Sequence, residues 1–514
     1  MTVQEVRLCG LLLQEHFGEV VEKVGTELLR SGALNLRALA HQTGIQLDLV
    51  KKSLCVLAQH SMCVFGPGRR GPGGPVEYTV NSERILYMLR YPRYIYTAKS
   101  LYGDTGELVI EEILQRGQMT MSSTVKTVAD RLTHSMEDGQ SMEYSEVIAA
   151  FTRLVETHFL QRCPLMDNAG AAGRTSSAVS ESPAPAAAPP VQPENFPDCY
   201  KIPQIHLTGR GKRRRSSEDG DAEERGTKKV CGDEGIYWQV NFERFHLHFR
   251  HQAIISAVAS KLDQTSSEIV RTMLRLSEVT TPANATYTQA LSANEIFRAL
   301  PASYNIGRPI LDQYLTLLVD DPMEFVSKTG DSGGGMYVVN LHRALANLAR
   351  ATLESVVQER FGSRSARIFR LLLRKRHLEQ KQVEDFAMIP AKEAKDMLYT
   401  LLSENLVQLQ EIPKTPDYAP SRTFYLYTVN QLPTARLLLQ NCYKKSQRIE
   451  AILASLQASG ADAAQLTEVE EMITPPERQQ LEALSVSLRT ILQKFTVLTF
   501  IPCNYIQSNR VKLA

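Results

Sequence analysis

Residues 385–412, DFAMIPAKEAKDMLYTLLSENLVQLQEI, decide the fold of this chain. They read as a short helix, a turn, a longer helix and a short strand. In the longer helix Ala394, Leu398 and Leu401 recur at i, i+4 and i+7, and a polar turn separates them from the apolar Leu406. This order is typical of the first half of a winged helix-turn-helix. A chain of 514 residues has room for three or more domains, so further copies are expected.

Three other stretches fit the same pattern. Their apolar positions are Val50, Leu54, Leu57 and Met62; Val147, Phe151, Leu154 and Phe159; and Leu311, Tyr314, Leu317 and, with one extra residue, Met323. A Gly- or Pro-rich turn and a β-branched or aromatic run follow three of the four copies, at 76–80, 336–341 and 422–429, which indicates a wing hairpin. The second copy has no evident wing and continues into a linker. The alternative is four coincidental amphipathic helices, which would not share this order.

The sequence therefore predicts a mainly α protein with small β-sheets, built from four winged helix-turn-helix domains and a C-terminal helical hairpin or coiled coil. The expected domains are 1–83, the first winged helix; 84–165, a connecting helix and the second; 166–232, a disordered linker with a basic run; 233–345, the third; 346–432, the fourth; and 433–514, the C-terminal helical hairpin with an atypical tail.

Composition excludes several classes of protein. Hydrophobic residues make up 43% and charged residues 22%, as in ordinary folded domains. No apolar run approaches the roughly 18 residues of a membrane helix, and the first 20 residues lack a signal-peptide pattern, so we expect no membrane contact. The 8 cysteines form no CxxC pair, which argues against a disulfide framework or zinc site and for a reducing compartment.

The strongest charge concentration lies where the fourth copy begins. On a helical wheel its arginines lie opposite Ile368, Phe369 and Leu372, and the nearly unrelieved positive face predicts a surface that follows phosphates. An acidic protein partner and simple solvation remain open. The predicted second helices also carry lysines, which suit phosphates better than base edges. The nucleic-acid-binding candidates are Arg364, Arg367, Arg370, Arg374, Lys375, Lys392, Lys395, Lys51 and Lys52.

The linker carries a basic run, Lys212, Arg213, Arg214 and Arg215, which suits a nuclear import signal. Ser216 and Ser217 precede acidic residues and are candidates for phosphorylation, which would offset the positive charge. A solvated charge run is the alternative.

Two aromatic segments allow different interpretations. Residues 84–103 alternate Tyr and Arg, which favours either stacking on nucleic acid or a half-buried connecting helix, the second being the simpler reading. Trp238, Phe242, Phe245 and Phe249 predict one helix with a buried aromatic stripe. His246, His248 and His251 do not converge on such a helix, and we expect no metal there.

Catalytic motifs are not found. The sequence has no GxxxxGK[ST], GxSxG or HExxH pattern and no protein-kinase set, so we expect no active site, no cofactor and no metal.

Long collinear stretches carry a family resemblance, among them RYPRYIYT, DQTSSEIVRTMLR, GDSGGGMYV, LESVVQERFGSRSARIFRLLL, KQVEDFAMIPAKEAKDMLY and EIPKTPDYAPSRTFYLYTVN. Over nearly all of residues 1–483 the chain resembles the RPC-three family, the winged-helix subunit of eukaryotic RNA polymerase III, which is related to the large subunit of TFIIE. Two segments depart from the family pattern. CYKKSQRIEA looks shortened, and the sequence after Leu484 does not resemble the family's end.

The resemblance implies a non-catalytic subunit, because catalysis belongs to the two largest polymerase subunits. It implies a three-subunit subcomplex with a smaller winged-helix subunit and an acidic-tailed subunit, docked on the clamp of the largest subunit. It further implies contact with TFIIIB and with DNA, mostly without sequence preference, and promoter opening for transfer RNA, 5S ribosomal RNA and other short transcripts. The expected location is the nucleus, with a possible cytosolic pool linked to DNA sensing.

Two other classes remain as alternatives. A protein-interaction scaffold could use winged helices without touching DNA, although such scaffolds usually carry one terminal winged helix. A sequence-specific regulator should place Arg, Asn or Gln along its second helices, where this chain offers lysines.

Overall fold

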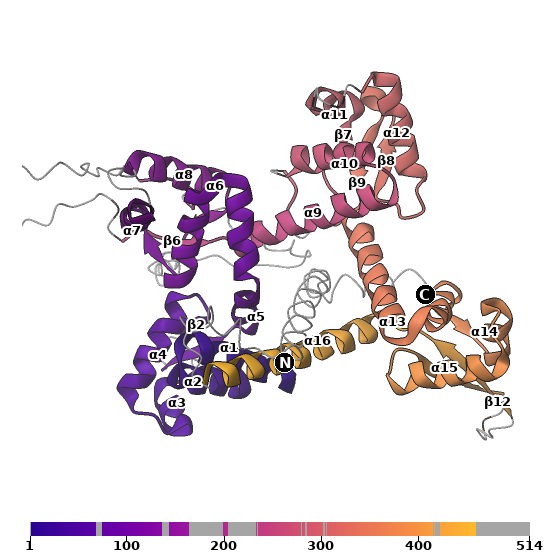
Figure 1. The fold of residues 1–514 in the computed structure, drawn as a ribbon, viewed down its shortest axis with the longest axis horizontal. Helices are drawn as coiled ribbons and strands as arrows, with labels where there is room; N and C mark the ends of the chain where they lie inside the picture. Colours follow the sequence, from indigo (N-terminus) through magenta and orange to yellow (C-terminus); the bar gives the residue numbers. More distant parts are fainter. Residues whose placement is uncertain are drawn as a thin grey trace, which may run out of the picture. The chain divides into compact units, whose positions relative to one another are not determined.

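The computed structural model describes residues 2–67, 75–135, 143–163, 199–203, 233, 235–278, 280–282, 285–301, 304, 306–414, 416 and 422–458. Contacts divide the chain into two compact units, one of Cys9–Phe245 and one of Met1–Leu8 with the residues from His246 onward. The predicted class is confirmed: helices dominate the described residues, and the four three-stranded antiparallel sheets found there each belong to a winged helix (Figure 1). In the described ranges no helix is long and apolar enough to cross a membrane.

The first winged helix follows the sequence prediction closely. Its sheet has the order β1-β3-β2, and Val50, Leu54 and Leu57 of the second helix of the motif are buried. The elements are α1 (Val3–Phe17), α2 (Glu19–Ser31), β1 (Leu34–Asn35), α3 (Leu36–Thr43), α4 (Leu47–Gln59), β2 (Cys63–Pro67) and β3 (Val76–Val80).

The second winged helix has a wing strand that the sequence analysis did not predict. Strand β6 pairs with β5 on one side, with Leu160 opposite Val240, and with β4 on the other, with Met119 opposite Trp238. The elements are α5 (Ser82–Leu86), η1 (Tyr87–Arg90), α6 (Tyr91–Arg116), β4 (Met119–Thr120), α7 (Met121–Ser135), α8 (Tyr144–Glu156), β5 (Leu160–Arg162) and β6 (Tyr237–Val240).

This strand corrects two interpretations. The second copy is not wingless, and residues 237–240, which we assigned to the third winged helix, complete the second. Trp238 lies on β6, so the aromatic stripe is not one helix; the helix begins at Phe242. Strands β5 and β6 of this wing lie before and after the linker in the sequence. The sequence analysis looked for wing strands joined by a short turn, and it could not find this hairpin.

The third winged helix shows an error of helical register. In α12 the buried residues are Leu311, Leu315 and Leu318, whereas the predicted Leu317 is 48% exposed. Buried Phe325 takes the place we gave to Met323, so the turn holds two extra residues and not one. The elements are α9 (Phe242–Lys261), α10 (Gln264–Ser277), β7 (Leu291–Ser292), α11 (Ala293–Ala299), α12 (Arg308–Asp320), β8 (Val326–Gly330), η4 (Ser332–Gly334) and β9 (Met336–Val339).

The fourth winged helix contains the stretch that opened the sequence analysis. Ala394, Leu398, Leu401 and Leu406 all lie in its core, as predicted. The elements are α13 (Leu341–Lys375), β10 (His377–Leu378), α14 (Gln380–Ala387), α15 (Ala391–Ser403), β11 (Gln408–Pro413), β12 (Thr423–Thr428) and α16 (Gln431–Ala458). Residues 459–514, with the second arm of the expected hairpin and its tail, lie outside the described residues.

Backbone geometry supports four copies of one motif. In each, a residue with positive φ follows the second helix of the motif: Ser61 (56°), His158 (66°), Glu324 (50°) and Asn405 (55°). In three copies the next amide closes the helix end by donating to the carbonyl of the last core leucine. These bonds run from Met62 to Leu57 (2.9 Å), Phe159 to Leu154 (2.9 Å) and Leu406 to Leu401 (3.0 Å).

Glycine marks the start of the first helix in three of the copies. Gly18, Gly103 and Gly362 have φ of 86°, 76° and 82° with ψ of 172°, −170° and 173°. This region of backbone space is almost restricted to glycine. At each site one helix ends and the next begins at a new angle, so α6 and α13 are each two helices joined at a glycine.

Replacing Gly362 with Ala is therefore expected to destabilise the fourth winged helix by about 1–3 kcal/mol, because the new Cβ makes this backbone conformation strained. The space beside Gly362 is empty, so a clash cannot be the cause. Denaturant unfolding checks the value. The control is Gly66→Ala, where φ is not positive and the space is also empty. Equal stability of the two variants would contradict the expectation.

Candidate nucleic-acid interface

The predicted arginine face exists on the second half of α13. Arg364, Arg367, Arg370 and Arg374 are exposed, and Ile368, Phe369 and Leu372 are buried on the opposite side. The helical-wheel assignment of the two sides is thus correct. Phe361, which a helical wheel puts on the same side as these apolar residues, is only half-buried.

This face is not unrelieved positive charge, and that expectation is wrong. Arg364 pairs with Glu393, and Arg370 Nε lies 2.9 Å from Glu354 Oε2. The neighbouring Arg360 Nη2 lies 3.2 Å from Glu404 Oε2. Two of these carboxylates come from α15 and the turn after it, so a wheel drawn for α13 alone could not include them. A chain of alternating charges covers most of the face.

Arg367 is also held by the protein. Its Nη1 donates to the backbone carbonyl of Ala387 at 3.3 Å, at the end of α14. The arginine connects α13 to the helix-turn-helix and offers less of its guanidinium to a ligand than the sequence suggested.

The positive charge left over is at the C-terminal end of α13. Arg374, Lys375 and Arg376 are consecutive and exposed, and none forms an ion pair with a described residue. Cations are favourable here because the last helical carbonyls carry partial negative charge. Lys375 lies over the Phe386 ring at 5.6 Å. We call Arg374, Lys375 and Arg376 the basic terminus.

A groove of about 480 Å³ adjoins the basic terminus. Its lining combines polar residues, among them Arg376, His377, Gln408, Gln410 and Asn430, with leucines and alanines of α13. Donors and acceptors of this kind next to free cations suit a backbone of phosphates and sugars, or an extended peptide.

The lysines of the second helices lie on exposed surfaces. Lys51 Nζ pairs with Asp48 at 3.3 Å, and Lys395 lies over the ring of Tyr399 at 5.7 Å. Lys52 and Lys392 are exposed, and among the described residues neither is in an ion pair.

Net charge argues against these helices as the main phosphate contacts. Helix α4 carries two lysines and one aspartate (+1), and α15 two lysines with Glu393 and Asp396 (0). Helices α8 and α12 each have one arginine and two acids (−1). Helices that track phosphates are normally strongly positive. The structure brings Lys392 and Lys395 into the same domain as the basic terminus, and places Lys51 and Lys52 in a different unit.

The Tyr- and Arg-rich segment packs as a connecting helix. Tyr94 is fully buried, with ring centroids 5.4 Å from Phe242 and 5.1 Å from Phe245. Tyr91 stacks on Phe242 at 6.1 Å, and Arg90 is buried. These side chains join α6 to the segment after the linker, which supports the packing interpretation and not stacking on nucleic acid.

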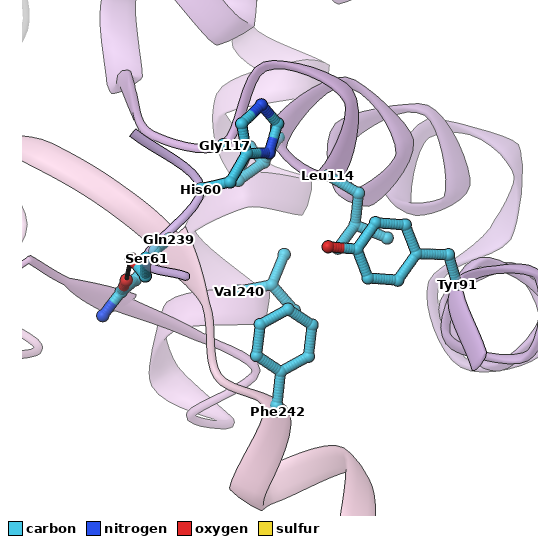
Figure 2. Close-up of a pocket in the computed structure, with 9 residues that line it drawn as sticks. His60, Ser61, Tyr91, Leu114, Gly117, Gln239, Val240 and Phe242 are labelled. Carbon is cyan, nitrogen blue, oxygen red and sulfur yellow. Dashed lines mark hydrogen bonds between the residues drawn. The ribbon is translucent and has the colours of Figure 1, made fainter. Parts of the chain in front are cut away.

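A small cavity of about 20 Å³ lies where the first and second winged helices meet (Figure 2). His60 and Ser61 border it from the first, Tyr91 and Leu114 close it from the second, and Phe242, at the start of α9, completes the lining. Ser61 Oγ bonds to Gln239 Oε1 at 2.9 Å. The volume suits one water molecule, so the cavity is a packing defect in an interface and no ligand site.

Burial, and then the charge of His16, lower the pKa of His60 to about 4 from 6.5. A histidine whose pKa is lower in the folded state stabilises it above pH 6.5, and the contribution is lost as pH falls towards 4. We expect the first winged helix to lose on the order of 2–3 kcal/mol over this range. Thermal unfolding from pH 7 to 4 tests it: His60→Gln should show a shallower pH dependence, and an unchanged slope would contradict the assignment.

No group of three or more His, Cys, Asp or Glu in the described ranges is arranged to hold a metal ion. The basic run at 212–215 and the serines at 216 and 217 lie outside the described residues. The described surface offers charged side chains and exposed apolar area, which suit binding to other molecules.

The sequence analysis missed one feature of the opening stretch. Phe386, in the last turn of α14, and Met388, in the turn that follows, are 57% and 87% exposed. Both stand outside the i, i+4, i+7 pattern of α15, and that is the signal that should have drawn attention to them.

In the described residues, four winged helices, the basic terminus and near-neutral second helices define a multi-winged-helix protein. Four family models agree with it. They describe the RNA polymerase III subunit RPC82 helix-turn-helix domain (residues 7–67), RNA polymerase III subunit RPC82 (149–348), the POLR3C C-terminal winged-helix domain (353–429) and the DNA-directed RNA polymerase III subunit RPC3 helical hairpin domain (444–494).

Curated relatives match over nearly the full length. DNA-directed RNA polymerase III subunit RPC3 of Danio rerio is 78% identical over 511 residues, and that of Homo sapiens 60% over 514, each covering 94% of both chains. The protein of the same name from Dictyostelium discoideum is 29% identical over 219 residues, 40% of this chain and 33% of its own. The chain belongs to the RPC3 family of RNA polymerase III subunits. The hairpin model matches as far as residue 494, whereas the relatives cover 94% of the chain, so the departure expected after Leu484 stays a prediction.

Proposed function

We propose that this chain is a non-catalytic subunit of RNA polymerase III that acts in transcription initiation. The observation that carries the proposal is 78% identity across 94% of the chain to a protein named as subunit RPC3 of that polymerase. Its partners are then the other polymerase subunits, including a smaller winged-helix subunit, an acidic-tailed subunit and the clamp of the largest subunit. Its template genes encode transfer RNA, 5S ribosomal RNA and other small RNAs.

The initiation role includes contact with TFIIIB and with DNA, mostly without sequence preference. The basic terminus beside the groove supports DNA contact, because it concentrates three exposed cations, none of which is in an ion pair with a described residue. The near-neutral second helices favour one alternative, a winged-helix scaffold that binds only proteins. The two functions differ in their dependence on the basic terminus.

Affinity purification of the tagged chain tests the proposal. We expect the polymerase III subunits to be recovered in equal amounts with it, and depletion of the chain to reduce transfer RNA and 5S RNA synthesis. Recovery of the chain without polymerase subunits would contradict it. A separate fraction from cytosolic extract would address the cytosolic pool and DNA sensing.

A nuclear location follows from the proposed function, with Lys212, Arg213, Arg214 and Arg215 as the import signal. Deleting these four residues is expected to shift a tagged free chain towards the cytoplasm, because import receptors bind short basic runs. Imaging measures the change, and unaltered nuclear entry when the partner subunits are scarce would contradict it. Phosphate on Ser216 or Ser217 would lower the local positive charge, so Ser→Asp variants should move in the same direction.

A further inference from the structure

Residues 199–203, in the middle of the predicted linker, contact the second winged helix. The ring of Tyr200 stacks on the ring of His158, with 3.9 Å between the centroids and 22° between the planes. The Tyr200 hydroxyl forms a hydrogen bond with the side chain of Asn241, and burial raises the pKa of this hydroxyl. Asn241 Nδ2 also donates to the carbonyl of His158 at 3.0 Å. Tyr200 is therefore bound by residues at the end of the β5–β6 pair.

The same segment covers the outer edge of β5. In an antiparallel pair, successive amides of one strand point to opposite edges. The amide of Cys163 donates towards β6, to the carbonyl of Tyr237 at 2.9 Å, so the amide of Arg162 points away from β6. There it donates to the carbonyl of Cys199 at 3.0 Å, and the Arg162 guanidinium donates to the carbonyl of Lys201. Edge amides without a partner can pair with a foreign strand, and natural sheets cover them.

The turn before β5 does not itself require a ring at position 158. His158 has φ 66°, and the equivalent residues of the other three winged helices, Ser61, Glu324 and Asn405, also have positive φ. Serine, glutamate and asparagine therefore all fit this turn. What the imidazole adds is the stack with Tyr200. The contact is a property of the second winged helix and not of the shared motif.

The predicted linker is bound at a second place, near its end. Asp233 is buried, and its Oδ2 accepts a hydrogen bond from the amide of Ser122 at 2.6 Å, at the start of α7. A carboxylate is favourable there because the first amides of a helix have no partner within the helix. Residues 199–203 and Asp233 thus keep both ends of the segment between them on the second winged helix.

We propose that the second winged helix has a binding site for a tyrosine-containing segment of its own chain, and that residues 199–201 occupy it as a clasp over the edge of β5. The site consists of the His158 ring, the Asn241 side chain, and the amide and guanidinium of Arg162. The clasp closes this edge to other strands and fastens the linker, at its middle, to the domain from which it starts. The inference does not depend on the proposed function, because every group in it belongs to one chain.

Hydrogen exchange of the Arg162 amide in the full chain tests the clasp. Tyr200→Ala should speed this exchange at least about fivefold, because an edge amide is protected only while its acceptor is held in place. His158→Ser should have a similar effect, since Ser61 shows that serine fits the turn. Tyr200→Phe keeps the stack and should have a smaller effect than Tyr200→Ala. The control is Tyr96→Ala, at a tyrosine of α6 that is 70% exposed, which should leave the exchange unchanged.

A double variant, Tyr200→Ala with His158→Ser, shows whether the two rings act together. If they form one contact, the double variant should exchange at Arg162 no more than about twofold faster than either single variant. Effects that multiply would mean two separate roles and would overturn the clasp. Equal exchange at Arg162 in the wild type and in Tyr200→Ala would overturn it as well. The fluorescence of Trp238, the only tryptophan, checks that each variant keeps the second winged helix folded.

A photo-crosslinking phenylalanine analogue at position 200 examines the same contact while keeping an aromatic ring there, so it does not depend on how well the variants fold. Cross-links to residues 157–163 or 241–244 of the same chain support the clasp. Cross-links only to other parts of the chain, or only to other molecules, contradict it.

Discussion

A fragment ending at residue 232, where the sequence placed the start of the third winged helix, is expected to lose the fold of the second, whereas a fragment ending at 245 keeps it. Strand β6 is the middle strand of the sheet β4-β6-β5, so without it neither remaining strand has a partner. The loss includes fully buried Trp238, whose ring packs edge-on against Phe151 at 5.5 Å between centroids.

The size of this effect follows from that side chain. Removing a buried Trp typically costs 3–5 kcal/mol, close to the whole stability of a small domain. Trp238 is the only tryptophan of the chain, so its fluorescence reports on the second winged helix alone. The fragment ending at 245 should show the blue-shifted emission of a buried indole and a cooperative transition. Far-ultraviolet circular dichroism should show reduced helix content in the shorter fragment.

A point variant in the full chain separates packing from truncation. Trp238→Ala should lower the unfolding midpoint of the second winged helix, and Tyr237→Ala, at a half-exposed neighbour, should not. Hydrogen exchange of α8 can follow both variants. If the fragment ending at 232 is as protected in α8 as the longer one, β6 is not needed and the argument fails.

Local pattern predicted most of the fold, because in three of the four motifs the helices and strands follow one another closely in the sequence. The i, i+4, i+7 spacing found α4, α8 and α15 with the right buried residues. In α12 the sequence analysis used residues at i, i+3 and i+6. Residues with this spacing do not stay on one face of a helix, and Leu317 therefore lies on the exposed side. The strand β6 could not be found in this way, since no periodicity connects a strand to a partner beyond a long linker.

The candidate site was less predictable, and the reason is electrostatic. A helical wheel orders the charges of one helix, but Glu393 and Glu404 reach the arginine face from elements that only the fold brings close. The arginines at the middle of the face became internal partners. Those at the end of the helix kept their charge free because no described acid packs against them. Likewise, the exposure of Met388 is a property of a turn and has no periodic signal.

Neutralising the basic terminus is expected to have the second large effect, on DNA binding. Arg374, Lys375 and Arg376, changed together to Gln, should reduce the affinity for short DNA of arbitrary sequence at least about tenfold near 0.1 M salt. The slope of log affinity against log salt concentration should become shallower by about 2–3, because DNA binding releases fewer counterions when phosphate contacts are lost. Since these side chains are exposed and in no ion pair with a described residue, stability should change little.

The comparison with the paired arginines makes this test specific. Reversing Arg364, Arg367, Arg370 and Arg374 to Glu, as the sequence alone would suggest, places new carboxylates beside Glu393 and Glu354. That variant should lose roughly 1–2 kcal/mol of folding stability, so weaker DNA binding by it would not identify a contact. The matched control changes Lys23, Arg30 and Arg37, exposed cations of the first winged helix, together to Gln. It removes the same amount of positive charge and should leave the salt slope nearly unchanged. If both triples reduce the slope equally, binding depends on total charge and not on this segment. If neither triple variant changes the salt slope while polymerase assembly is intact, the basic terminus does not touch DNA. The alternative function, a scaffold that binds only proteins, is then favoured.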